Sequence, residues 1–257
     1  RQRQMCIRDR YNVGELDVFS FAKIVKERHA QIPVALLTSF SKDIYRRLEE
    51  QDRSGLDYIF GWHGNTDLIM AIIKLVEDKM NAEEDITDGG VQAILLVEDS
   101  IRFYSTYLPE LYKLILLQNT EFLKDAFNEQ QQILRKRARP KILLATNYEE
   151  AVELYDRYKK NMLGVISDVG FVLHRNDLCR RIKADNPLMP VLLQSSQTEF
   201  EVQARQLGAG FIAKNSKTLL TQLHEYIDKE FAFGEFLFKD PDTGAVIGKA
   251  KDLVQMQ

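Results

Sequence analysis

The stretch AILLVEDS, residues 93–100, has five apolar residues followed directly by two carboxylates and a hydroxyl. A run this short and this apolar is typical of a β-strand that is buried on both faces. Such strands belong to parallel sheets, in which ligands bind beyond the carboxyl ends of the strands. Two adjacent negative charges at such an end predict a functional site, and we expect them to help to hold a divalent metal ion.

The bulk composition excludes several classes of function. The chain has 257 residues, of which 45% are hydrophobic and 28% charged, with a net charge of −3. This acidic balance argues against a nucleic-acid partner, which usually requires a basic face. No apolar run approaches the roughly 20 residues that cross a bilayer, so we expect no membrane partner. The two cysteines, Cys6 and Cys179, show no metal or redox spacing, and we expect a cytoplasmic protein.

An internal repeat organises the chain. Residues 24–41 and 181–198 share a helix-like segment, a proline, a short apolar strand and then hydroxyl residues. Residues 54–62 and 207–215 share a glycine followed by a short strand that begins with an aromatic residue. Both matches lie at nearly the same offset, which predicts two copies of one α/β unit.

The repeat and the composition between its copies predict the domain boundaries. The opening RQRQMCIRDR is either a basic tail or, as we favour, a non-native read-through that spans residues 1–11. The polar segment NAEEDITDGG reads as a linker. The predicted order is a tail (1–11), the C-terminal part of a degenerate copy (12–80), a linker (81–90), a complete copy (91–230), and the start of a following module with a possible hairpin (231–257).

The complete copy alternates strands with helices. This order, with strands that are nearly all apolar, predicts an α/β fold with a doubly wound, five-stranded parallel sheet. Because parallel strands end at one edge, the residues after each strand should gather there. These residues are Glu98 and Asp99 after the first strand, Asp168 after the third, Ser195 after the fourth and Lys214 after the fifth.

This order of residues resembles the receiver domain of two-component response regulators. The resemblance covers residues 91–230 and rests on "VED", "ISD", "QSS" and "IAK" at the ends of the predicted strands. It implies the flavodoxin-like receiver fold. It also implies that Mg²⁺, which prefers oxygen ligands, is held by Glu98, Asp99, Asp168 and the backbone carbonyl of Gly170.

The resemblance further implies a phosphorelay function for this copy. Asp168 would be the nucleophile that accepts a phosphoryl group from a histidine kinase or a small phosphodonor. Lys214 would neutralise charge on the transferred group, and the Ser195 hydroxyl would bond to it. Phe211 matches the aromatic residue of the family that turns inward when this hydroxyl moves. Phosphorylation would then regulate an attached or partner module.

Each of these residues also has an ordinary structural interpretation. Acids at strand ends often cap helices or form turns, Ser195 could be a cap, and Phe211 could be a core residue. Asn215 replaces the proline that usually follows the lysine in the family. The alternative is therefore a pseudo-receiver that docks partners without phosphorylation.

The flanking regions resemble the family less closely. In the degenerate copy, Thr38 matches the hydroxyl position and Tyr58 the aromatic, whereas Gly61 falls where the lysine would be. The segment at 231–253 resembles the region that follows tandem receiver-like domains in phosphoenolpyruvate synthase and pyruvate phosphate dikinase-like proteins. That resemblance implies that the chain is a regulatory part of such an enzyme, without catalytic turnover of its own, with an enzyme module downstream.

Overall fold

The computed structural model describes residues 12–13, 16–39, 52–62, 64–124, 139–171, 178–231, 237–239 and 246–249. The expected non-native tail, residues 1–11, lies outside them. The chain divides into two compact units, which are described separately. The first comprises the residues up to Ile72 together with Ser100–Pro109, and the second comprises Ile73–Asp99 and the residues from Glu110 onward.

The first unit contains two small sheets and a helix. Its elements are the antiparallel strands β1 (Asn12–Val13) and β2 (Leu16–Asp17), helix α1 (Val18–Arg28), and the parallel strands β3 (Ala35–Ser39) and β4 (Tyr58–Trp62). Asp17 caps α1, since its carboxylate accepts hydrogen bonds from the backbone of Phe19 and Ser20 at 2.9 and 3.2 Å. The Ser105 hydroxyl accepts the backbone N–H of Gly61 at 3.0 Å.

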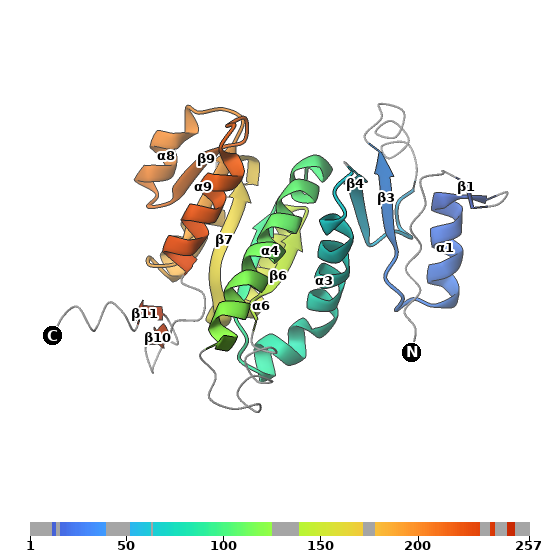
Figure 1. The fold of residues 1–257 in the computed structure, drawn as a ribbon, viewed down its shortest axis with the longest axis horizontal. Helices are drawn as coiled ribbons and strands as arrows, with labels where there is room; N and C mark the ends of the chain where they lie inside the picture. Colours follow the sequence, from blue (N-terminus) through green and yellow to red (C-terminus); the bar gives the residue numbers. More distant parts are fainter. Residues whose placement is uncertain are drawn as a thin grey trace. The chain divides into compact units, whose positions relative to one another are not determined.

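The second unit is built on a five-stranded parallel sheet in the order β6-β5-β7-β8-β9. Its strands are β5 (Ala93–Val97), β6 (Lys141–Ala145), β7 (Met162–Asp168), β8 (Val191–Ser195) and β9 (Gly210–Ala213) (Figure 1). In chain order this is the 2-1-3-4-5 arrangement of flavodoxin-like, doubly wound folds. The predicted fold class is confirmed.

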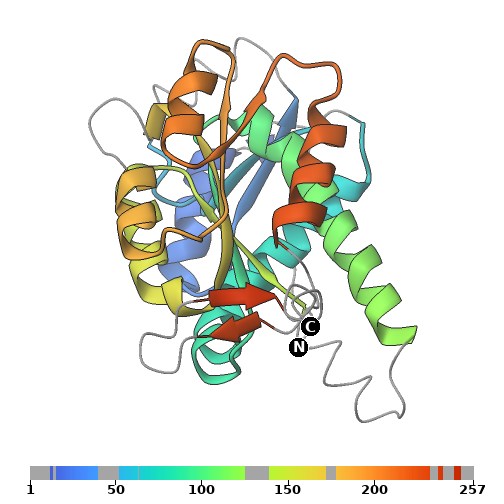
Figure 2. The same cartoon turned by 90° about the vertical axis from the view of Figure 1, so that its left-hand side faces the viewer.

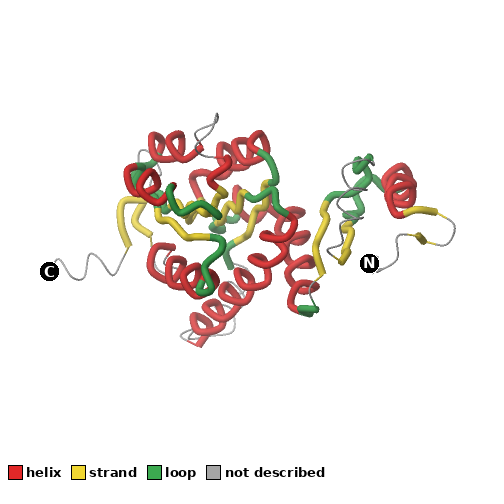
Figure 3. The backbone as a smooth tube through the Cα atoms, turned by 90° about the horizontal axis from the view of Figure 1, so that it is seen from above, coloured by secondary structure: helices red, strands yellow, loops and turns green. Residues whose placement is uncertain are grey.

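Helices cover both faces of this sheet (Figures 2 and 3). Helices α6 (Tyr148–Tyr158), α7 (Leu178–Asp185) and α8 (Phe200–Gln206) pack through Tyr155, Ile182 and Ala204 on the face that carries Leu95, Val165 and Leu193. Helix α9 (Leu219–Tyr226) and the part of α4 (Ile101–Lys124) from Glu110 onward cover the opposite face. None of the helices among the described residues has the length and apolar character needed to cross a membrane.

The start of α6 shows how local sequence sets an element boundary. The side chain of Asn147 accepts the backbone N–H of Glu150 at 2.8 Å and thereby caps the helix. The Glu150 carboxylate accepts the backbone N–H of Thr146 at 3.0 Å, one residue before the cap. The carboxylate thus reaches one residue further back than in a standard capping box.

The segment expected to be a linker, residues 81–90, is mostly helical. Helix α3 (Asp67–Ala82) runs into it and continues as the π-helical turn η1 (Glu83–Asp88). Ile86 is fully buried in the core of the second unit, and its carbonyl accepts the Asn161 amide at 2.7 Å. Two apolar residues in an otherwise polar stretch, Ala82 and Ile86, thus anchor it to the core.

Phe231, the first residue of the segment predicted to begin a following module, packs in the second unit. It ends the π-helical turn η4 (Ile227–Phe231) after α9 and is 1% exposed. A Cβ atom at Gly164 of β7 would lie 2.2 Å from the Phe231 ring, so only glycine leaves room for it. Beyond it, β10 (Leu237–Lys239) and β11 (Val246–Lys249) form the antiparallel pair expected of a hairpin, and residues 240–245 between them lie outside the described residues.

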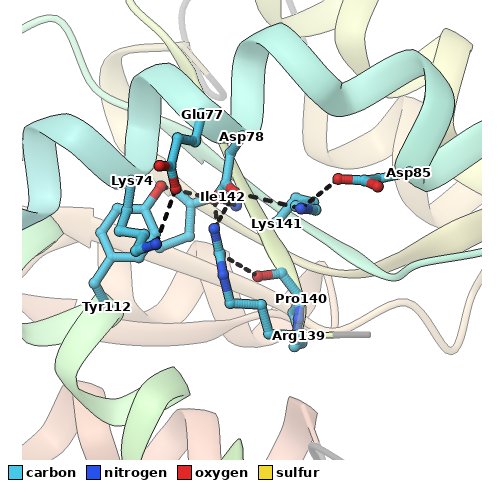
Figure 4. Close-up of polar contacts among 9 residues, drawn as sticks. All are labelled: Lys74, Glu77, Asp78, Asp85, Tyr112, Arg139, Pro140, Lys141 and Ile142. Carbon is cyan, nitrogen blue, oxygen red and sulfur yellow. Dashed lines mark hydrogen bonds and ion pairs between the residues drawn. The ribbon is translucent and has the colours of Figure 1, made fainter. Parts of the chain in front are cut away.

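A buried charge cluster joins α3 to the edge strand β6 (Figure 4). Asp78 is fully buried, and Arg139 donates to both its oxygens at 2.5 and 3.1 Å. The same carboxylate accepts the Tyr112 hydroxyl at 2.8 Å and the backbone N–H of Ile142 at 3.0 Å. Lys141 lies 3.8 Å from Asp78 and 2.5 Å from Asp85.

This cluster satisfies a backbone group of the edge strand and also holds α3 in place. An edge strand presents unpaired backbone N–H groups, and Asp78 accepts one of them. Burial alone would lower the pKa of the Arg139 guanidinium, but the hydrogen bonds and negative charge of Asp78 outweigh burial and raise it. The hydrogen-bonded pair of Asp78 and Arg139 fixes α3 to the second unit.

We expect Gly164→Ala to destabilise the second unit by about 1–3 kcal/mol, because the added methyl group overlaps the Phe231 ring. Urea unfolding monitored by circular dichroism measures this. In the double variant with Phe231→Leu, the loss of unfolding free energy should be smaller than the sum of the losses in the two single variants. Losses that simply add in this double-mutant cycle would contradict the packing described here.

We expect Arg139→Met to lower the free energy of unfolding by about 3–5 kcal/mol, because it leaves the Asp78 carboxylate buried without its cation. Lys74→Met is the matched control. Lys74 pairs with Glu77 at 2.8 Å on the solvent side of the same helix, where such pairs contribute less than about 1 kcal/mol. Similar losses in the two variants would refute the assigned importance of the buried pair.

Candidate functional site

Three of the predicted site residues meet at the carboxyl edge of the sheet. The Lys214 ammonium group donates to Glu98 at 2.6 Å and forms an ion pair with Asp168. The side chains of Lys214 and Glu98 are 4% and 1% exposed, whereas that of Asp168 is 22% exposed. Of the two carboxylates, only Asp168 can therefore be reached by a reactant from solvent.

The register of the sheet explains this meeting. Val97 pairs with Ser167 and Asp168 pairs with Gln194, so Glu98 and Asp168 continue one row across neighbouring strands. Residues in register on parallel strands point to the same face. Lys214 follows β9, and its backbone N–H donates to the Ser195 carbonyl at 2.8 Å, which ties the ends of β8 and β9 together.

Both oxygens of Asp168 have partners. One faces Lys214, and the other accepts the backbone N–H of Gly170 at 2.6 Å. Gly170 lies in the 3₁₀ turn η3 (Val169–Phe171), and a Cβ atom there would come within 2.9 Å of this oxygen. The backbone after β7 therefore turns back to hold the carboxylate, and glycine permits the close approach.

Ser195 and Phe211 lie on the other face of the sheet from the Lys214 contacts. Ser195 is buried, and its hydroxyl accepts the backbone N–H of Gln197 at 3.1 Å, as a turn residue would. Phe211 is half-buried and packs against the core beneath α6, α7 and α8. Ser195 is on β8, next to β7, and Phe211 is on β9, but the structure does not bring their side chains into the Lys214 cluster.

The fit of a magnesium ion depends on the carboxylates. Glu98, Asp99 and Asp168 offer the hard oxygen ligands that this ion takes, so the donor set fits it in kind. Asp99, however, is exposed, and no group of three acidic, histidine or cysteine side chains among the described residues is arranged to hold a metal. The Lys214 ammonium group occupies the position between Glu98 and Asp168 that a cation would share.

One residue of this region was not predicted. Gln194 is 1% exposed on β8, and its side-chain amide nitrogen is buried without a hydrogen-bond partner in the described part of the chain. A glutamine inside the apolar run PVLLQSS was the available signal. Asn215, which stands in place of a proline, donates from its side chain to the Ser196 carbonyl at 3.3 Å.

The strands of the segment predicted to be a degenerate copy, β3 and β4, can be compared with β8 and β9 by their pairing. Thr38 pairs with Gly61, whereas Ser195 pairs with Ala213, the residue before Lys214. By register, Trp62 rather than Gly61 therefore corresponds to Lys214. Neither residue carries a charge, so this pair of strands has no cation at that position.

Comparisons with known proteins find similarity in structure only. No family model and no curated protein matches the sequence. A response regulator receiver domain protein from Clostridium thermocellum has 20% identity and a TM-score of 0.36, and the match covers 55% of this chain and 95% of that one.

Two further solved structures are similar to this chain. The chemotaxis protein CheY4 of Vibrio cholerae has 19% identity and a TM-score of 0.35, over 53% of this chain and 98% of its own. A probable two-component system response regulator/GGDEF domain protein has 14% identity and a TM-score of 0.33, over 81% and 73% of the two chains. Identities and scores this low carry no functional argument, and the fold assignment rests on the strand order and register.

We expect Lys214→Met to destabilise the second unit by about 3–5 kcal/mol, because Glu98 would be left as a buried carboxylate without this ammonium group. Adding Glu98→Gln should recover part of the loss. Lys217→Met, at an exposed position on the same loop, is the control and should change little. Thermal unfolding of the four proteins measures this, and equal melting temperatures for the two lysine variants would contradict the assignment.

Proposed function

We propose that the second unit is a phosphoacceptor receiver module of a phosphorelay, in which Asp168 takes a phosphoryl group and thereby regulates an attached or partner module. The observation that carries the proposal is the contact of Lys214 with Glu98 and Asp168 at the edge of the sheet where ligands bind in this fold. In this proposal the module works in the cytoplasm and has no catalytic turnover of its own.

The proposed transfer follows from the position of Asp168. An oxygen of its carboxylate attacks the phosphorus of a phosphohistidine on a histidine kinase, or of a small phosphodonor such as acetyl phosphate. A P–O bond to Asp168 forms, the bond to the donor breaks, and the imidazole or acetate leaves with its electron pair. Lys214 already lies beside Asp168 in this structure, so its ammonium group is close enough to turn toward the added oxygens.

A magnesium ion would support this step. Glu98, Asp99 and Asp168, with the carbonyl of Gly170, are the residues that would hold it. When bound, it supplies positive charge for the oxygens of the transferred group. Two carboxylates and one ammonium group leave the Lys214 cluster with an excess of negative charge, which is an electrostatic reason for it to take up a cation.

Ser195 would carry the effect of phosphorylation from Asp168 to the opposite face of the sheet. A hydroxyl both donates and accepts, so Ser195 can keep the bond from Gln197 and turn its proton toward a phosphoryl oxygen. Its carbonyl already accepts the Lys214 backbone N–H. Movement of either residue would shift β9, in which half-buried Phe211 would provide the switch that alters the surface.

The alternative is a pseudo-receiver that docks partners without phosphorylation, as the regulatory region of a phosphoenolpyruvate synthase-like enzyme. One observation favours it: both oxygens of Asp168 are already engaged, by Lys214 and Gly170. In this case the ion pair is a permanent structural element. The degenerate copy, which has no charge at the position of Lys214, is the precedent within the chain for such a loss.

Incubation with Mg²⁺ and acetyl phosphate should add one phosphoryl group, detected by intact-mass spectrometry and removed by hydroxylamine, which cleaves acyl phosphates. Asp168→Asn should abolish the addition, and Asp185→Asn, at an exposed position on α7, should not. Labelling that survives Asp168→Asn would place the acceptor elsewhere. If neither acetyl phosphate nor beryllofluoride acts on the wild-type protein, the pseudo-receiver is the correct interpretation.

A further inference from the structure

Gln194 is a buried polar side chain that the free protein does not use. It is 1% exposed, and its amide nitrogen lacks a hydrogen-bond partner within the described residues. Its neighbours on β8, Leu192 and Leu193, are fully buried apolar residues. An unsatisfied buried amide costs free energy that another leucine at this position would not, and such a group calls for a specific explanation.

The register places Gln194 beside the acceptor. Gln194 pairs directly with Asp168 on β7 and with Ile212 on β9, two residues before Lys214. In-register neighbours on parallel strands lie about 4.8 Å apart and point to the same face, so Glu98, Asp168 and Gln194 form one row. Lys214 follows β9 two residues after Ile212, and its ammonium group reaches this row.

In the free protein the Gln194 amide nitrogen makes no hydrogen bond to Asp168. One carboxylate oxygen of Asp168 is held by Gly170 and the other by Lys214. A phosphoryl group on Asp168 would bring three further oxygens to this place, each able to accept hydrogen bonds. The unused donor is thus matched to a group that is present only after transfer.

We propose that Gln194 donates its amide N–H to an oxygen of the phosphoryl group on Asp168, as a third side-chain donor beside Lys214 and Ser195. This inference rests on the proposed function. It makes Gln194 a positioning residue for the bound oxyanion, because a neutral amide on a rigid central strand orients the group without adding charge. The bound state would gain a hydrogen bond that the free state lacks, so the amide favours phosphoryl binding selectively.

Beryllofluoride, which mimics the phosphoryl group, tests this by titration in the presence of Mg²⁺, followed by ¹⁹F NMR of the bound fluorides. Gln194→Met keeps the length of the side chain and removes the donor, and we expect it to weaken binding about 10-fold. Gln194→Glu keeps the shape but places a carboxylate there, and it should weaken binding further. Gln203→Met, at an exposed position on α8, is the matched control and should bind like the wild type.

A stability measurement separates positioning from packing. Without beryllofluoride, Gln194→Met should unfold at the same or a higher denaturant concentration than the wild type, because it removes an unsatisfied amide. Wild-type affinity in both Gln194 variants overturns the inference, as does a lower stability of Gln194→Met with unchanged affinity. If the wild type itself binds no beryllofluoride, the proposed function fails, and the role of Gln194 fails with it.

Discussion

The arrangement of the second unit depends on one buried ammonium group shared by two carboxylates. Lys214, Glu98 and Asp168 come from the ends of three strands, which the parallel sheet of order 2-1-3-4-5 brings to one edge. Charges this deeply buried are stable only when paired. The contact therefore constrains the loops after β5, β7 and β9 together.

The asymmetry of exposure within this contact gives the two acids different chemistry. Glu98 is closed off from solvent, whereas Asp168 is partly open to it. In the proposed receiver function, Lys214 would turn from Asp168 toward an added oxyanion while it stays bonded to Glu98. The same cation would then be paired with a carboxylate both before and after the proposed transfer.

The sheet could be predicted from the sequence because its strands are short apolar runs that end in chemically distinct residues. The positions of Glu98, Asp168 and Lys214 followed from the rule that parallel strands end at one edge. The buried pair of Asp78 with Arg139 could not be predicted, because its members are distant in the chain and each sits among other charged residues. Gln194 was missed for a related reason. The role of one polar residue in an apolar strand can be judged only when the residues that pair with it on the neighbouring strands are known.

The anchoring of α3 by Asp78 has a consequence for how the second unit can exist as a separate piece. A fragment that began at Val91 would contain every strand, but it would lack the carboxylate that serves Arg139, Tyr112 and the outward backbone N–H of Ile142. It would also open to water the space filled by Ile86. The smallest autonomous folding segment therefore begins upstream on α3, within a helix that also contributes residues to the first unit.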